Sequence, residues 1–149
     1  MKRFLNVALL LAILVPTALA TGCASSTAGA ATGGQNMKMA PLSMLPAEMQ
    51  GAPTTVREAY QFAVANPDAL KNVPCYCGCG AMGHTSNYSC YVKDSKADGT
   101  VVYDSHALGC SLCVDITQEV MRLSRAGQSP GQIHAQVVAD FGSYGPPNQ

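Results

Sequence analysis

The chain has 149 residues, with 9 basic and 9 acidic side chains, 7 cysteines and no tryptophan. Lys2 and Arg3 lie in an N-terminal segment that we expect to be removed, so the mature chain keeps 7 basic against 9 acidic residues, a formal charge of −2. No basic surface remains to argue for a nucleic-acid partner, which excludes that class of function.

Residues 1–22 have the layout of a bacterial lipoprotein signal peptide. A basic start is followed by the uncharged run LNVALLLAILV, and LATGC places small residues before Cys23. The run is short for a transmembrane helix. We expect lipid on Cys23, a thioether-linked diacylglycerol with an N-acyl chain such as palmitate, to anchor the protein on the extracytoplasmic side of a membrane in the cell envelope. Because Ala20 stands where leucine is commoner, a cleaved secretory signal or a transmembrane segment is the alternative.

The mature chain is predicted to have a tether, a single domain and a short tail. Residues 23–53 form the tether, because ASSTAGAATGGQ cannot bury enough apolar surface to become ordered. Residues 54–144 form the domain, and residues 145–149 the tail. At roughly 90 residues the domain has a thin core and needs covalent or metal cross-links.

The segment TTVREAYQFAVANP predicts the first helix. Thr55 and Glu58 are spaced as a capping box, and Asn66-Pro67 marks the end of the helix. Its apolar face comprises Val56, Ala59, Tyr60 and Ala63.

The segment NVPCYCGCGAMGH follows, with three cysteines at alternate positions. In an extended chain alternate side chains share a face, so Cys75, Cys77 and Cys79 project together, and Gly78 and Gly80 allow the backbone to bend around a common centre. A disulfide between neighbours in this triplet would close a strained ring. The pattern therefore favours a metal thiolate site.

Further on, CYV and TVVY flank KDSKADG, whose Asp98-Gly99 pair favours a short β-hairpin. GCSLCVDITQEVMRLSRAG predicts a second helix with Leu112, Ile116, Val120 and Leu123 on one face. SPGQIHAQVVADFG predicts a third, with Ser129 and Gln132 as a capping box. Its buried stripe comprises Ile133, Val137, Val138 and Phe141. The expected fold is a mainly α, small cysteine-rich domain of about three helices packed around a cysteine-rich loop. One short β-hairpin is an optional addition to this fold.

Other soft donors stand near these elements. Cys110 and Cys113 fall on the first turn of the second helix, where both sulfurs share one face, and Cys90 begins the CYV segment of the expected hairpin. His84 and His106 lie within a few residues of cysteines, so either could ligate a metal or donate a hydrogen bond to a thiolate.

The strings PCYCGCG at 74–80, GH at 83–84, Cys90 and DSHALGCSLC through Cys113 resemble the family of bacterial lipoproteins named for the PCYCGC motif. The similarity extends over about residues 67–141. It implies an exported, lipid-anchored, cysteine-rich domain and no particular activity.

The donor types narrow the choice of metal. Thiolates favour Cu(I), Zn(II) and iron–sulfur clusters, but cluster assembly normally occurs inside the cell. Six cysteines, two histidines and Met82 exceed one tetrahedral site, so two zinc ions or a small copper–thiolate cluster would use them. We expect Cu(I), with Zn(II) as the alternative, because the tether also carries thioether sulfurs that could capture copper. They belong to Met37, Met39, Met44 and Met49.

Two other classes of function stay open. A disulfide-stapled interaction domain suits an oxidising compartment, and a thiol–disulfide oxidoreductase could use Cys110 and Cys113. No nucleophile–base constellation is evident, so we expect a binding protein rather than an enzyme. The expected partners are a metal ion, the membrane through the lipid on Cys23, and a metal-handling protein of the envelope.

Overall fold

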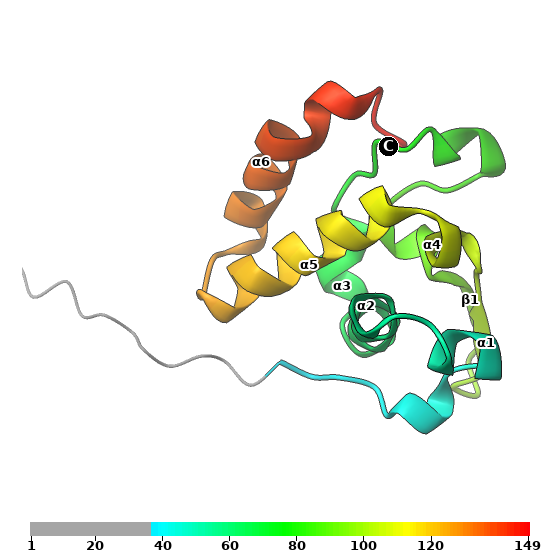
Figure 1. Ribbon diagram of the computed structural model, residues 1–149. Helices are drawn as coiled ribbons and strands as arrows, with labels where there is room; N and C mark the ends of the chain where they lie inside the picture. Colours follow the sequence, from blue (N-terminus) through cyan, green and yellow to red (C-terminus); the bar gives the residue numbers. More distant parts are fainter. Residues whose placement is uncertain (1–36) are drawn as a thin grey trace, which may run out of the picture. The chain divides into compact units, whose positions relative to one another are not determined.

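Helix α5 (Ser111–Arg125) lies at the centre of the fold in the computed structural model, which describes residues 37–149 (Figure 1). It packs against α2 (Thr54–Ala65) and against α6 (Pro130–Phe141). Contact on two sides requires a wide apolar face, and α5 has one. Its buried residues are Cys113, Val114, Ile116, Thr117, Val120, Met121 and Leu123.

Helix α2 confirms the first predicted helix but not its predicted cap. Pro53 is the N-cap residue, with φ −53° and ψ 151°, and its carbonyl accepts the amides of Val56 and Arg57 at 3.0 Å. Thr55 therefore lies inside the first turn, where its hydroxyl cannot take the capping position, and the predicted Thr55/Glu58 capping box is wrong.

Helix α6 begins as predicted, with a complete capping box between Ser129 and Gln132. Its buried stripe is narrower than predicted, because Ile133 and Val137 are buried whereas Val138 is exposed. The helix packs mainly on α5, so a single neighbour covers one side of it and leaves Val138 in solvent.

Three further helices were not predicted because each is too short to show a helical period. They are α1 (Ala47–Gln50), α3 (Pro67–Lys71) and α4 (His106–Gly109). Helix α3 starts one residue after α2 reaches its C-cap at Asn66, since Pro67 cannot continue a helix but suits the first position of a new one. This sharp break directs the chain towards the cysteine-rich segment.

The predicted hairpin is confirmed. Strand β1 (Val92–Ser95) pairs antiparallel with β2 (Val101–Tyr103), with an irregularity between Val92 and Asp94. Gly99 adopts φ +86° in the connecting turn, a conformation that favours glycine. The hairpin packs against the 3₁₀ turn that contains Cys90.

The second half of the predicted tether packs on the domain. Met49 is 1 % exposed and belongs to the hydrophobic core. The Ala40 amide donates to the Gln61 carbonyl at 3.0 Å, and the Tyr103 hydroxyl donates to the Met44 carbonyl at 2.9 Å. The folded part therefore begins well before the predicted boundary at residue 54, and packing explains Met49 without a metal.

The predicted signal peptide, Cys23 and the first half of the tether lie outside the described residues, which start at Met37. Within residues 37–149 no helix is both long and apolar enough to cross a bilayer. The same residues hold six α-helices and one two-stranded hairpin around a cysteine cluster, which confirms the predicted mainly α, cysteine-rich class.

Candidate metal centre

The eight predicted donor residues lie together at one end of α5. They form four overlapping groups in which the donor atoms are all within 4.8 Å of one another. The groups are Cys77, His106, Cys110 and Cys113; Cys79, His84, Cys90 and His106; Cys75, Cys77 and Cys79; and Cys75, Cys90 and Cys113.

The PCYCGC segment reaches this arrangement through a turn. Gly78 adopts φ +79°, and a 3₁₀ turn from Cys79 to Met82 follows, so the backbone bends at Gly78 as predicted, while Gly80 lies within the 3₁₀ turn. The bend at Gly78 directs Cys79 back towards the other two thiols, and all three sulfurs remain within ligand range of one another. Gly83, at φ +86°, ends the turn just before His84.

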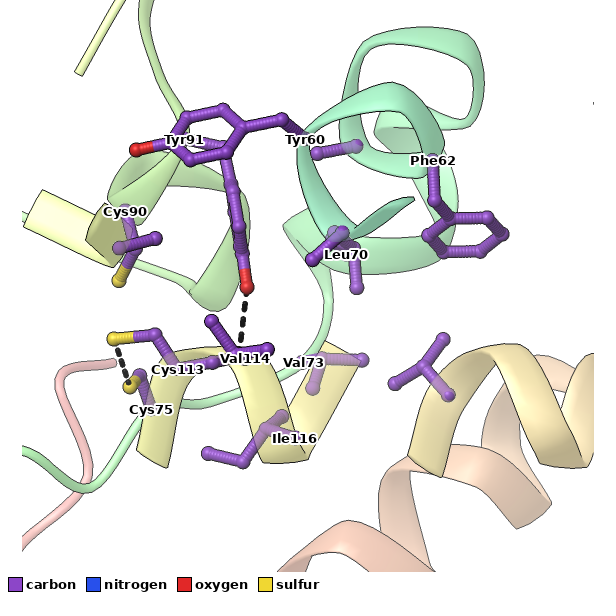
Figure 2. Close-up of a cluster of buried hydrophobic side chains, with 14 of the residues drawn as sticks. Tyr60, Phe62, Leu70, Val73, Cys75, Cys90, Tyr91, Cys113, Val114 and Ile116 are labelled. Atoms are coloured by element: carbon purple, nitrogen blue, oxygen red, sulfur yellow. Dashed lines mark hydrogen bonds between the residues drawn. The ribbon is translucent and has the colours of Figure 1, made fainter. Parts of the chain in front are cut away.

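Cys75 is the central thiol of the cluster. Its Sγ lies 3.4 Å from the Sγ atoms of both Cys77 and Cys113. Cys75 and Cys113 are fully buried beside the apolar core, and Figure 2 shows their sulfurs facing each other below Cys90 and Tyr91. The buried half of the cluster is thus continuous with the packing of the domain.

The start of α5 supplies two more thiols. Cys110 is the N-cap residue and Cys113 lies in the first turn, so their Sγ atoms are 3.3 Å apart, as the CxxC spacing predicted. Cys77 Sγ is 3.6 Å from Cys113 Sγ, and Cys79 Sγ is 3.8 Å from Cys90 Sγ. All six described cysteines are free thiols.

The two histidines lie edge to face, with ring centroids 5.1 Å apart. His106 Nε2 is 3.4 Å from Cys77 Sγ. His84 is 8 % exposed, its Nε2 lies 3.4 Å from the Asp104 carboxylate, and its Nδ1 is buried without a hydrogen-bond partner. A metal ligand explains this orphaned atom, because ligating histidines commonly direct the other ring nitrogen to a carboxylate. The donor set therefore fits a soft metal ion.

Shared hydrogen bonds make the thiols unequal as acids. Hydrogen bonds from neighbouring thiols, Cys113 first, lower the pKa of Cys75. The same bond with Cys75 raises the pKa of Cys113, while burial raises the pKa values of Cys77 and Cys79. Among these four thiols, Cys75 is thus the one that most readily forms a thiolate, and a bound cation would favour deprotonation of Cys77, Cys79 and Cys113.

A buried polar network holds the backbone at Cys113. The Tyr91 hydroxyl donates to the Cys113 carbonyl at 2.8 Å, and the Asn87 side-chain amide donates to it at 3.2 Å. The Thr117 hydroxyl contacts both the Tyr91 hydroxyl and the side-chain Oδ1 of Asn87 at 2.7 Å. Since these partners are fully buried and mutually satisfied, they fix the first turn of α5 and the direction of its thiols.

The family model for proteins of unknown function with a PCYCGC motif matches residues 7–149. The chain belongs to this family. Comparisons with curated proteins and with solved structures gave no significant match. The matched range covers the domain and all eight donors.

Sequence reasoning missed two residues of this PCYCGC protein that touch the donors. Asp104 faces His84, and its carboxylate accepts the His106 amide at 2.8 Å. Asn148 lies in the predicted tail, where its Oδ1 accepts the Cys75 amide at 2.7 Å and its Nδ2 contacts Cys79 Sγ at 3.4 Å. Asp104 stands two residues before His106, which was a usable signal, whereas nothing local marks Asn148.

Proposed function

We propose that this protein is an exported, lipid-anchored metal-binding protein that holds Cu(I) in the cell envelope. The observation that carries the proposal is the overlap of donor groups around Cys75, whose sulfur is within ligand range of two cysteine pairs. One pair is Cys77 and Cys79, and the other is Cys90 and Cys113. The lipid anchor and the envelope location rest on the sequence before Ala24.

The crowding of the sulfurs favours metal over disulfides. A disulfide pairs one sulfur with one other at about 2.05 Å, whereas Cys113 Sγ has three sulfur neighbours between 3.3 and 3.6 Å. Thiolates that bridge metal ions use several such neighbours at once. Cys113 is fully buried, so a dithiol enzyme would have to use the half-buried Cys110 as its attacking thiol.

The overlap also favours copper over zinc. Structural zinc sites almost always take four ligands in a closed tetrahedron. The two four-residue groups share His106 and leave out Cys75, so they do not divide into two independent zinc sites. Cu(I) accepts fewer ligands and prefers soft thiolates, so a small cluster with bridging sulfurs uses the whole set. Zn(II) remains the alternative metal.

The test is an anaerobic metal titration of the full chain, purified in detergent. We expect more than one Cu(I) per chain, with thiolate-to-copper absorption, in competition with a chromophoric chelator, and weaker or fewer equivalents of Zn(II). Cys75→Ser should reduce the number of bound Cu(I) ions because it removes the shared sulfur. Stoichiometric disulfides and no bound metal would overturn the proposal, and a Cys110–Cys113 pair that cycles without metal would favour the oxidoreductase.

Lipid anchoring is tested separately at Cys23. We expect Cys23→Ser to abolish fatty-acid labelling and to move the protein out of the membrane fraction, because it removes the only attachment point that the lipobox offers. Cys110→Ser is the matched control and should be labelled like the natural chain. Persistent labelling of Cys23→Ser would refute the assignment.

A further inference from the structure

A cleft of about 510 Å³ opens beside the second donor group of the cluster, which comprises Cys79, His84, Cys90 and His106. Both histidines of that group line the cleft, together with Met82, Lys93 and Asp104. The two cysteines of the group are buried and do not line it. An ion in the cleft therefore meets the imidazoles before it meets the thiols.

His84 brings an unpaired, buried ring nitrogen to the wall of this cleft. The side chain is more than nine-tenths buried, and its Nδ1 has no hydrogen-bond partner. Leaving a buried nitrogen unpaired costs free energy, so an occupant that takes its lone pair is favoured. Asp104 beside Nε2 holds the ring so that Nδ1 is the nitrogen left available.

Met82 is the other unexplained side chain of the cleft. It is 58 % exposed, so hydrophobic packing does not account for it. It ends the same 3₁₀ turn that begins with Cys79, and positive φ angles at Gly78 and Gly83 fix that turn on both sides. A thioether is thereby held on the same cleft as two imidazoles, and thioether sulfur is a soft ligand that stays reduced more readily than a thiol.

The charges of the cleft do not attract ions of either sign strongly. The Asp104 carboxylate and the Lys93 ammonium both line it and cancel in formal charge. Capture must therefore depend on donor chemistry rather than on the electrostatic field. Met82, His84 and His106 together suit Cu(I) better than a hard cation, which would require oxygen ligands.

We propose that this cleft is the port through which Cu(I) reaches the cluster, with Met82 as its first protein ligand. The ion passes from Met82 to His84 and His106 and then to the buried thiolates. Copper stays in the +1 state, each step exchanges one ligand for another, and a thiol that becomes a ligand releases its proton to solvent. This inference rests on the proposed function of the cluster.

A second route would avoid the cleft. Cys77 and Cys110 are only half-buried, so a donor could deliver copper directly to that edge of the first group. The two routes differ in their dependence on Met82, because it lines the cleft and the edge route needs only thiols. A kinetic measurement therefore separates them.

The experiment follows Cu(I) transfer between a chromophoric chelator and the full chain by stopped flow, in both directions. Met82→Leu keeps the apolar bulk and removes the sulfur, and we expect transfer to slow about tenfold with unchanged stoichiometry. Val138→Leu on α6 is the control, since Val138 is 41 % exposed, carries no donor atom and does not line the cleft. Thr85→Trp, which fills the cleft, should also slow transfer, whereas Thr100→Trp in the hairpin turn should not.

The outcomes separate the two proposals. If the natural chain and the variants hold the same amount of Cu(I) and exchange it at equal rates, the port is refuted and the metal-binding function stands. If none of the proteins takes up Cu(I), both proposals are refuted. If Met82→Leu loses copper at equilibrium without a slower exchange, Met82 is a permanent ligand and the port is again refuted.

Discussion

At the scale of single residues, Asn148 links the C-terminus to the cluster. Its amide N–H donates to the Cys75 carbonyl at 3.0 Å while its side chain accepts the Cys75 amide at 2.7 Å. In Figure 1 the C-terminus accordingly ends beside the green segment that carries the PCYCGC motif. Its side-chain Nδ2 also contacts Cys79 Sγ, where it can donate to a thiolate.

Asn148→Ala should weaken metal binding by about tenfold, because partners that orient ligands typically contribute 10–100-fold in affinity. A Cu(I) competition titration measures this. Gln149→Ala is the control, since Gln149 reaches only the Lys71 carbonyl, at 3.4 Å, and does not touch the cluster. Equal affinities for Asn148→Ala and the natural chain would mean that the tail is only a surface contact.

Asp104 is the residue that orients both histidines. Asp104→Asn keeps the size of the side chain but removes the negative charge beside His84 Nε2, so the basicity of Nδ1 should fall. We expect copper affinity to drop about tenfold, with little change in the melting temperature of the metal-free protein. Asp94→Asn on the exposed hairpin is the control. A normal affinity for Asp104→Asn would show that His84 does not bind the metal.

At the scale of elements, the turn that follows Gly78 decides whether the cysteine triplet converges. Gly78 has φ +79°, and a Cβ there would meet no atom within 4 Å, so any cost of a side chain is a backbone cost. Gly78→Ala should destabilise the protein by about 1 kcal/mol, which lowers the melting temperature of so small a domain by about 4–8 °C. Gly109→Ala also meets open space but at an ordinary φ, so it controls for the added methyl group. Equal melting temperatures would contradict a strained turn.

The long helices were predictable from the sequence because their apolar residues recur over several turns, as Ile116, Val120 and Leu123 do along α5. The eight donors were recognisable by type and spacing, because thiols and imidazoles are the side chains that bind soft metal ions and they recur here at short intervals. What the sequence could not show is the overlap of the groups, because Cys75 and Cys113 are brought together by tertiary packing alone. The same is true of Met49, whose burial depends on contacts far along the chain.

At the scale of the whole molecule, the metal centre and the hydrophobic core are one structure. Cys75, Cys90 and Cys113 belong to the same buried cluster as Tyr60 and Tyr91, whose rings meet edge to face at 5.0 Å. Figure 2 shows Cys90 beside Tyr91, with Cys113 and Cys75 below them. Because the core is small, occupancy of the cluster should govern the stability of the entire domain.

Loading with Cu(I) should therefore raise the melting temperature of the whole protein in one cooperative step. A free metal concentration 100-fold above the dissociation constant corresponds to about 2.7 kcal/mol of stabilisation. Calorimetry at increasing Cu(I) activity, set by a chelator buffer, measures it. Val138→Leu serves as a control that should respond identically, and a transition that does not move with copper would separate the cluster from folding.

Metal binding should also release protons, and the unequal acidity of the thiols fixes the sign. The raised pKa values of Cys77, Cys79 and Cys113 keep these thiols protonated at neutral pH, so each must lose its proton on becoming a ligand. Cys75, whose pKa is lowered, is already a thiolate and contributes no proton.

Lowering the pH therefore weakens binding, because protons compete with copper for the same sulfurs. A titration in weak buffer with a pH indicator should detect more than one proton released per chain. Cys75→Ser should bind fewer Cu(I) ions per chain, whereas the number of protons released for each bound ion should change little. Uptake of Cu(I) with no proton release would contradict the assignment of Cys77, Cys79 and Cys113 as protonated thiols that become ligands.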